Sequence, residues 1–145
     1  IVIGQSKWAD FRQIDIARRL VVNGAEVVAL HRDLTWPVGD VTRIALGPIV
    51  AAMESVIDGP VTVIGKPEKK FFTAALQHAK FQREHTIMIG DSVQSDIRGA
   101  IDSGLKSLLV RTGNGTNECI PTDCGGELAT IADLPDWCEK NLPKP

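Results

Sequence analysis

The chain has 145 residues, is 43% hydrophobic, and balances 16 basic against 18 acidic residues for a net charge of −2 at pH 7. This length can bury one substantial core, so we expect one domain, or one domain with part of another. The charges are scattered and no apolar run reaches the roughly 18 residues of a membrane span, which argues against nucleic-acid and membrane partners. We expect a cytoplasmic protein.

The first sixty residues alternate between strand and helix patterns. Phe11, Ile14, Ala17 and Leu20 recur at helical spacing, and Asn23-Gly24 is a typical helix end. The pattern predicts a strand at 1–4, a helix at 10–23, a strand at 26–30, a loop at 31–40 and a helix at 46–57.

The alternation is clearer after residue 60. It predicts strands at 61–64, 86–89 and 107–111, helices at 68–79 and 93–103, a long loop beyond Gly113, and a short helix at 136–142. Strands that alternate with helices of this length indicate right-handed βαβ units. The predicted fold class is therefore α/β, with a parallel sheet in a three-layer arrangement.

Candidate site residues follow these strands directly. Ligands of open parallel sheets bind at the carboxyl ends of the strands, where this chain has Gly65-Lys66-Pro67, then Gly90-Asp91-Ser92, then Thr112-Gly113. Because adjacent parallel strands point the same way, we expect Lys66 and Asp91 to lie on the same edge of the sheet.

The residue types suit phosphate chemistry. The Lys66 ammonium can bind a phosphate oxygen, next to the amides of the following helix. Asp91 offers the hard carboxylate oxygen that Mg²⁺ prefers. Asp96, one to two turns into the next helix, can accept a hydrogen bond from a metal-bound water or pair with Lys66.

Each residue also has a structural interpretation. A lysine after a strand is often a solvated loop residue, Asp91 could cap a helix, and Asp96 could be an ordinary acidic residue of a first helical turn. Their joint occurrence at consecutive strand ends favours a functional site.

The segments VIGKPEKKFF at residues 63–72, MIGDSVQSDIRGA at 88–100 and LVRTG at 109–113 resemble the third and fourth motifs of haloacid dehalogenase-like phosphatases. The likeness covers roughly residues 1–115. It is strongest to the branch with a large α/β cap, which contains nitrophenyl phosphatases and the phospholysine phosphohistidine inorganic pyrophosphate phosphatase. Ala29-Leu30-His31 and Gly47-Pro48 also resemble that last subgroup.

The resemblance implies specific roles. Lys66 corresponds to the catalytic lysine that binds the transferring phosphoryl group, Asp91 to the Mg²⁺ ligand and Asp96 to its supporting acid. Residues 1–60 correspond to the later part of the cap, and residues 61–145 to the second half of a Rossmann-like core. The implied function is Mg²⁺-dependent hydrolysis of a small phosphorylated substrate through an aspartyl-phosphate, in a protein that could form a homodimer.

The family's nucleophile motif, Asp-x-Asp, does not occur in these 145 residues. The chain also begins at Ile1, inside a predicted strand, so we expect an upstream segment to supply the nucleophile. The alternative is a non-catalytic phosphate-binding or scaffolding relative. A dinucleotide-binding module is disfavoured because no G-x-G-x-x-G follows a strand.

Other residues are weaker candidates. The three histidines, His31, His78 and His85, are too far apart in sequence to suggest a cluster. Trp36 lies where this cap type contacts substrate and is kept as a substrate-binding candidate. For Arg111 and Asn114, a salt bridge or a turn is the expected role. The cysteines, Cys119, Cys124 and Cys138, are odd in number and lack C-x-x-C spacing, so we expect free thiols.

Overall fold

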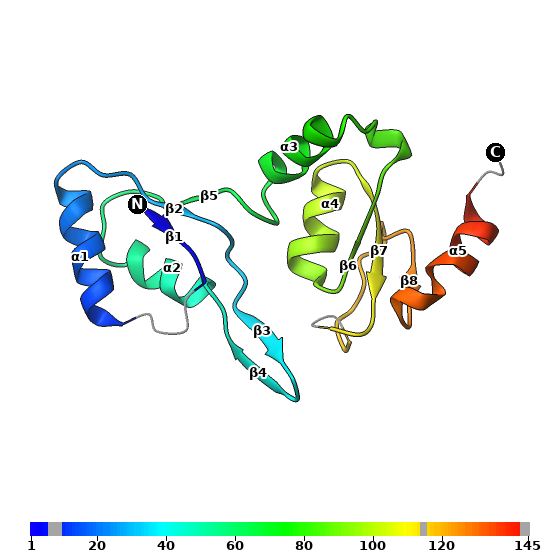
Figure 1. Cartoon of the computed structure of the whole chain (residues 1–145), viewed down its shortest axis with the longest axis horizontal. Helices are drawn as coiled ribbons and strands as arrows, with labels where there is room; N and C mark the ends of the chain where they lie inside the picture. Colours follow the sequence, from blue (N-terminus) through cyan, green and yellow to red (C-terminus); the bar gives the residue numbers. More distant parts are fainter. Residues whose placement is uncertain (6–9, 114–115, 143–145) are drawn as a thin grey trace. The chain divides into compact units, whose positions relative to one another are not determined.

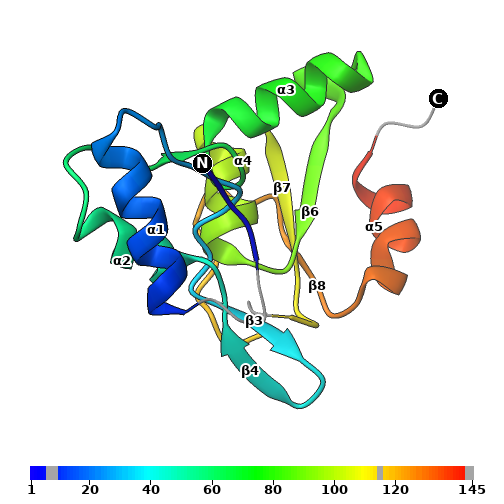
Figure 2. The same ribbon diagram turned by 60° about the vertical axis from the view of Figure 1, so that its left-hand side comes forward.

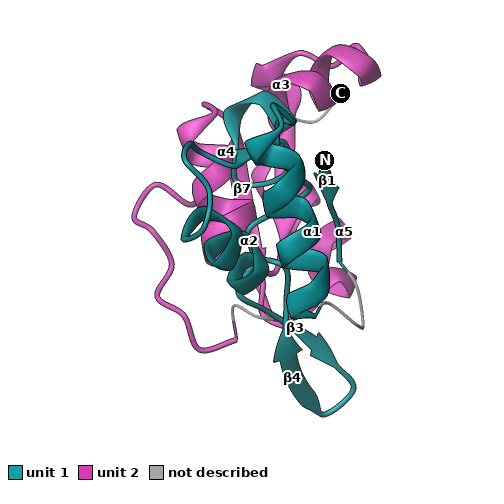
Figure 3. Cartoon of the chain, turned by 90° about the vertical axis from the view of Figure 1, so that its left-hand side faces the viewer, with its two compact units in different colours: residues 1–71 teal, residues 72–145 magenta. Residues whose placement is uncertain are grey.

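The computed structural model describes residues 1–5, 10–113 and 116–142. It divides into two compact units, Ile1–Phe71 and Phe72–Pro145, which Figure 3 colours separately. The boundary predicted at residue 60, between the cap and the core, stays a prediction. Each unit has its own parallel sheet and its own apolar core, and each is described by itself below (Figure 1).

Unit 1 is built on a parallel three-stranded sheet in the order β1-β2-β5, formed by Val2–Ile3, Val28–Ala29 and Thr62–Val63. In this register Ala29 lies opposite Ile3 on one side and Val63 on the other. Helices α1 (Phe11–Val22) and α2 (Gly47–Glu54) complete the unit. Its buried core consists of Val27, Ala29, Leu46, Val50, Met53, Val61 and Val63.

Helix α1 begins and ends where its sequence predicts. Asp10 accepts a hydrogen bond from the Gln13 amide, and the Gln13 side chain bonds back to the Asp10 backbone, which forms a capping box. Gly24, with φ of 94°, takes the left-handed conformation that ends the helix at low steric cost. The predicted helix is therefore confirmed to within one residue at each end.

An antiparallel hairpin replaces part of the loop predicted at residues 31–40. Strands β3 (Thr35–Val38) and β4 (Val41–Ile44) pair with Trp36 opposite Arg43 and Val38 opposite Val41. Figure 2 shows the hairpin extending beyond α1 and α2. The loop prediction was wrong because it rested on the turn preference of Pro37 and Gly39. Pro37 instead lies in β3, and a two-stranded ribbon tolerates proline because neither of its strands is a central strand of a sheet.

Unit 2 contains a second parallel sheet, β6-β7-β8, formed by Ile87–Gly90, Lys106–Val110 and Glu127–Leu128. Helix α3 (Lys69–Ala79) leads into this unit, and its Phe72 packs with Ala100 and Leu105. A π-helix, η2 (Val93–Arg98), runs directly into α4 (Gly99–Asp102), and η2 contacts both β6 and β7. The remaining elements are the 3₁₀ turns η1 (Arg83–His85) and η3 (Ile131–Asp133) and helix α5 (Leu134–Asn141).

The α/β class and the parallel strands are confirmed, but the predicted single sheet is wrong. The strand at Thr62–Val63 pairs with β2 in unit 1, whereas β6 and β7 pair with each other in unit 2. Periodicity indicates that a strand is buried and parallel, but it does not indicate which strand lies beside it. The helix predicted at 93–103 divides into η2 and α4, and the predicted loop beyond Gly113 contains strand β8.

No helix in the described parts of the chain is both long enough and apolar enough to cross a membrane.

Candidate functional site

Asp91 immediately follows Gly90, the last residue of β6, at the carboxyl end of the parallel sheet of unit 2. Its side chain is half-buried. Since β6 and β7 are parallel, the residues after both strands lie at the same edge of this sheet. The placement predicted for Asp91 relative to its own strand is therefore confirmed.

Asp96 holds the Asp91 loop from within η2. It is 2% exposed, and its Oδ2 accepts hydrogen bonds from the backbone amides of Asp91 and Ser92, both at 3.1 Å. Two charge-assisted hydrogen bonds compensate for the burial of a carboxylate. In this structure Asp96 supports the loop that carries Asp91.

The loop continues into η2 through a side-chain cap. Ser92 Oγ accepts a hydrogen bond from the Ser95 amide at 3.2 Å, and the Ile97 amide bonds to the Ser92 carbonyl at 3.1 Å. The latter bond spans five residues, which is the π-helical pattern and is frequent at functional sites.

Two glycines allow this close packing. A Cβ at Gly90 would overlap the Asp96 carboxylate, and a Cβ at Gly113 would overlap the Asp91 carboxylate. Gly113 follows β7, so the ends of two neighbouring strands meet at Asp91. Both glycines belong to the sequence motifs, without an expected role; their position at or near the ends of predicted strands was the available signal.

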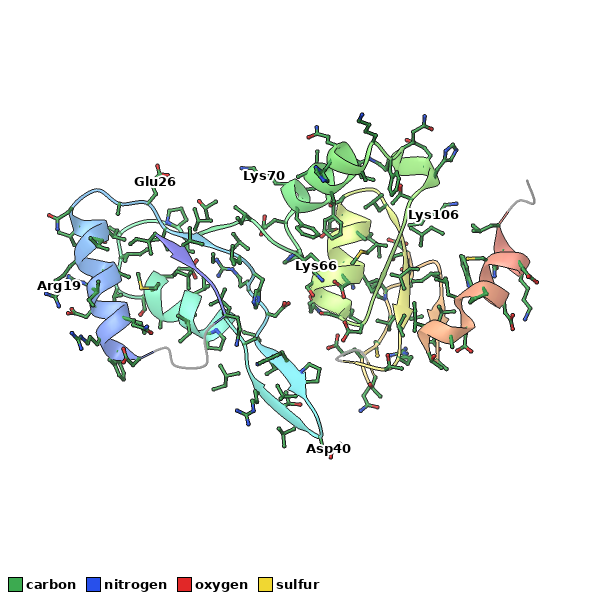
Figure 4. All side chains as sticks on the ribbon, viewed as in Figure 1. Arg19, Glu26, Asp40, Lys66, Lys70 and Lys106 are labelled. Atoms are coloured by element: carbon green, nitrogen blue, oxygen red, sulfur yellow. The ribbon has the colours of Figure 1, made fainter. Side chains whose placement is uncertain are left out.

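Lys66 lies in unit 1, on the segment that joins β5 to α3 (Figure 4). It is half-buried, and the preceding Gly65 packs so closely on the Leu30 carbonyl that a Cβ would overlap it. The close packing fixes the backbone from which the Lys66 side chain extends. Lys66 and Asp91 thus follow strands of two different sheets, contrary to the prediction of a shared sheet edge.

Trp36 also belongs to unit 1, on β3 and opposite Arg43. Its side chain is 40% exposed, so much of the indole surface can reach a ligand. The residues predicted for the site are therefore divided: Asp91 and Asp96 lie together in unit 2, and Lys66 and Trp36 lie in unit 1.

The donor chemistry at Asp91 suits Mg²⁺. This ion takes oxygen ligands and usually binds through one or two carboxylates together with waters and substrate phosphate. Within the described residues, no group of three or more His, Cys, Asp or Glu side chains could hold a metal ion.

The weaker candidates have structural partners. His31 Nδ1 accepts from the Asp33 amide at 3.3 Å and lies 3.3 Å from the Asp33 carboxylate. Arg111 forms the expected salt bridge, with Glu127 at 2.5 Å. Cys119, Cys124 and Cys138 form no disulfide. Asn114 lies outside the described residues.

An ion pair in unit 1 joins the segment after β2 to α2. Arg32 Nη1 and Nη2 donate to the two carboxylate oxygens of Glu54 at 2.9 and 2.6 Å. These hydrogen bonds lower the pKa of Glu54 and raise that of Arg32, against the opposing effect of burial; the charge of Glu68 also raises the Arg32 pKa.

A family model described as HAD-hydrolase-like matches residues 63–137, which is just over half of the chain. The chain belongs to the haloacid dehalogenase-like hydrolase family. The match includes both strand ends at which Lys66 and Asp91 lie, and the recognition of this family from its motifs is confirmed.

Curated relatives agree with this assignment. The chain is 38% identical over 114 residues to haloacid dehalogenase-like hydrolase domain-containing protein 2 of Bos taurus, a match that covers 78% of the chain and 44% of that protein. It is 29% identical over 142 residues to dihydroxyacetone phosphatase of Corynebacterium glutamicum, covering 94% and 52%. It is 30% identical to phospholysine phosphohistidine inorganic pyrophosphate phosphatase of Xenopus laevis, covering 71% and 39%. The chain thus spans about half or less of the length of these relatives.

Solved structures show the same fold. A thermostable NPPase double mutant from Geobacillus stearothermophilus has a TM-score of 0.77 at 28% identity, covering 87% of this chain and 51% of that one. A glycerol phosphate phosphatase from Mycobacterium tuberculosis, solved in complex with magnesium, has a TM-score of 0.67 at 31% identity, covering 77% and 33%. The relatives and structures together support the large-cap branch of the family.

Proposed function

We propose that the protein carrying this chain is a Mg²⁺-dependent phosphatase that hydrolyses a phosphate monoester or a small phosphoanhydride. The observation that carries the proposal is the Asp91 loop, where a strand-end aspartate is supported by two backbone hydrogen bonds to the buried Asp96 carboxylate. Relatives named as phosphatases support the reaction class. The neighbour solved with magnesium supports the metal.

The proposal assigns one role to each residue. Asp91 would bind Mg²⁺, Asp96 would hold the loop that carries Asp91, and Lys66 would bind an oxygen of the transferring phosphoryl group. Mg²⁺, when bound, supplies positive charge that stabilises the developing charge on the phosphoryl oxygens. Trp36 would contact the organic part of the substrate through its exposed indole.

The nucleophile would be an aspartate outside these 145 residues. Its carboxylate would attack phosphorus while the P–O bond to the leaving alcohol or phosphate breaks, which gives an aspartyl-phosphate. Water would then attack the same phosphorus, release inorganic phosphate and regenerate the carboxylate. The proposal therefore concerns the whole gene product, to which this chain contributes the metal-binding aspartate and the phosphate-binding lysine.

The test compares the full-length gene product with its Asp91→Asn and Lys66→Ala variants, using a generic aryl phosphate with and without Mg²⁺. We expect activity to require Mg²⁺ and each substitution to reduce kcat/KM by at least about a hundredfold, as the loss of a metal ligand or charge stabiliser should. Matched controls are Asp40→Asn and Lys70→Ala, two exposed positions labelled in Figure 4, which should retain activity.

The alternative is a non-catalytic phosphate-binding or scaffolding relative. An intact protein that binds phosphate but does not turn over the aryl phosphate would favour this alternative. Activity that is independent of Mg²⁺, or an Asp91→Asn variant as active as the unmodified protein, would contradict the proposed role of the metal.

A further inference from the structure

Arg111 joins three segments of unit 2 at the carboxyl end of β7. Its Nε and Nη2 donate to Glu127 Oε2 on β8 at 2.8 and 2.5 Å, and its Nη1 donates to the Glu118 carbonyl at 2.7 Å. Its backbone amide donates to the Leu128 carbonyl at 2.9 Å. One guanidinium therefore ties both Glu118 and Glu127 to the end of β7.

Thr116 also bonds to residues at the end of β7. Its hydroxyl lies 2.6 Å from the Gly113 carbonyl and 3.0 Å from the Arg111 carbonyl, and its amide donates to the Gly113 carbonyl at 3.3 Å. A hydroxyl has a single proton, so it donates to one of these carbonyls at a time. Either bond holds Thr116 close to the end of β7.

Gly113 lies against the side chain of Asp91, the metal-binding candidate. A Cβ at this position would overlap the Asp91 carboxylate and lie 2.7 Å from the Asp91 Cβ, which is closer than real Cβ atoms approach other atoms. The backbone of Gly113 therefore limits the directions that the Asp91 side chain can take. The backbone amide of Asp91 donates a hydrogen bond to Asp96, so both the backbone and the side chain of Asp91 are restrained.

We propose that Arg111 and Thr116 are positioning residues for Asp91. Through their hydrogen bonds to Glu118, Glu127 and the Gly113 carbonyl, they hold Gly113 against the carboxylate and keep the Asp91 side chain in the orientation that binds Mg²⁺. The proposal rests on the proposed function only in taking Asp91 as the metal ligand. Groups that orient metal ligands typically change metal affinity by about 10- to 100-fold when they are removed.

The experiment measures metal binding to the intact protein without substrate. Mn²⁺ accepts the same oxygen donors as Mg²⁺ and is visible by electron paramagnetic resonance, so its Kd is titrated directly and that of Mg²⁺ by competition. We expect Arg111→Met and Thr116→Val each to weaken Mn²⁺ binding by roughly tenfold or more. Gly113→Ala should weaken it at least as strongly, because its methyl group displaces the carboxylate.

A double-mutant cycle then tests whether Arg111 acts through Gly113. Arg111→Met combined with Gly113→Ala should weaken binding by less than the product of the two single effects, since both disturb the same contact. Arg111→Lys keeps the positive charge, but an ammonium group cannot replace the planar guanidinium that bonds to both Glu127 and Glu118. Its Mn²⁺ affinity should therefore lie between that of Arg111→Met and that of the unmodified protein. The matched control is Arg32→Met, which breaks a bidentate pair in unit 1 and should leave the Mn²⁺ Kd unchanged.

The outcomes separate this proposal from the proposed function. If Asp91→Asn leaves Mn²⁺ binding intact, the proposed metal ligand is wrong. If Asp91→Asn weakens Mn²⁺ binding but Arg111→Met and Thr116→Val lower only the free energy of unfolding, Asp91 is a metal ligand and the positioning role of Arg111 and Thr116 is wrong. Should Arg111→Met prevent folding, Thr116→Val decides, because Thr116 is exposed and its loss removes only local hydrogen bonds.

Discussion

Asp96 is a residue whose burial defines its role. Its carboxylate is 2% exposed, and two backbone amides donate to it, as a buried polar group requires. Asp96 lies in the first turn of η2, as its structural interpretation expected, but its side chain is buried and bonds to the preceding loop, unlike that of an acid on a helix surface. Its stabilising effect and its effect on Asp91 both depend on the same oxygen.

We predict that Asp96→Ala lowers the free energy of unfolding by about 2–4 kcal/mol, because it leaves two buried or half-buried amides without an acceptor. Asp96→Asn should cost less, since its amide oxygen still accepts a hydrogen bond at the same place. Urea denaturation of the intact protein measures both values. A loss of equal size in the two variants would show that charge, and not the acceptor, is what the loop requires.

At the scale of elements, the start of η2 depends on its N-cap residue, Ser92. Ser92 accepts from the Ser95 amide and so satisfies one of the donors left open at the start of a helix. Ser92→Ala should lower the free energy of unfolding by about 1 kcal/mol, the usual cost of an N-cap. Amide hydrogen exchange at Ser95 should rise in this variant, whereas exchange in α1 of unit 1 should not change. Unaltered protection at Ser95 would contradict the capping role.

The hairpin β3–β4 offers a different kind of prediction. Val41 and Ile44 are 55% and 69% exposed, and Trp36 is 40% exposed, so these side chains contribute little to the core. Trp36→Ala should therefore change the free energy of unfolding by less than about 1 kcal/mol. If the indole contacts substrate as proposed, the variant should raise KM for an aryl phosphate with a smaller effect on kcat.

The control for Trp36 lies on the same hairpin. Val41→Ala removes an exposed apolar side chain of β4, opposite Val38, and should alter neither KM nor stability appreciably. Equal effects of Trp36→Ala and Val41→Ala on KM would indicate that the hairpin acts through its shape and that the indole makes no specific contact.

Sequence patterns located most elements but not their partners. Helix α1 and strand β7 were predicted to within one residue, because capping residues, glycine and apolar periodicity act locally. The pairing of β5 with β2 was not predictable in this way, since it depends on packing between segments that are far apart in the chain. Asp91 was located because a strand-end aspartate needs only local signals, whereas the contact with Gly113 depends on the neighbouring strand.

At the scale of the whole molecule, each unit buries apolar residues of its own. Val50 and Met53 are buried in unit 1, and Ile97, Leu108 and Leu109 in unit 2. Each fully buried side chain of this kind stabilises its unit by roughly 1.5–3 kcal/mol. Substitutions in one core should therefore lower the stability of the unit that contains it. The Arg32–Glu54 pair lies in unit 1, so its loss should likewise lower the stability of unit 1.

The final prediction concerns the acid stability of unit 1. Hydrogen bonding to Arg32 lowers the pKa of Glu54 in the folded state, so the folded chain takes up this proton less readily than the unfolded chain. The resulting stabilisation is fully present above the ordinary glutamate pKa of about 4.3 and is lost as the pH falls through the lower, folded value. Its size should be no more than about 1 kcal/mol, because both side chains are partly solvated.

Urea denaturation between pH 7 and pH 3 tests this linkage in the unmodified protein and in Glu54→Gln. The two proteins should differ in stability at pH 7 and converge toward pH 3, where Glu54 becomes protonated and resembles the neutral glutamine. High salt should reduce the difference at pH 7, because it screens a partly exposed ion pair. A difference that persists unchanged to pH 3 would mean that Glu54 stabilises α2 by packing, independently of its charge and of Arg32.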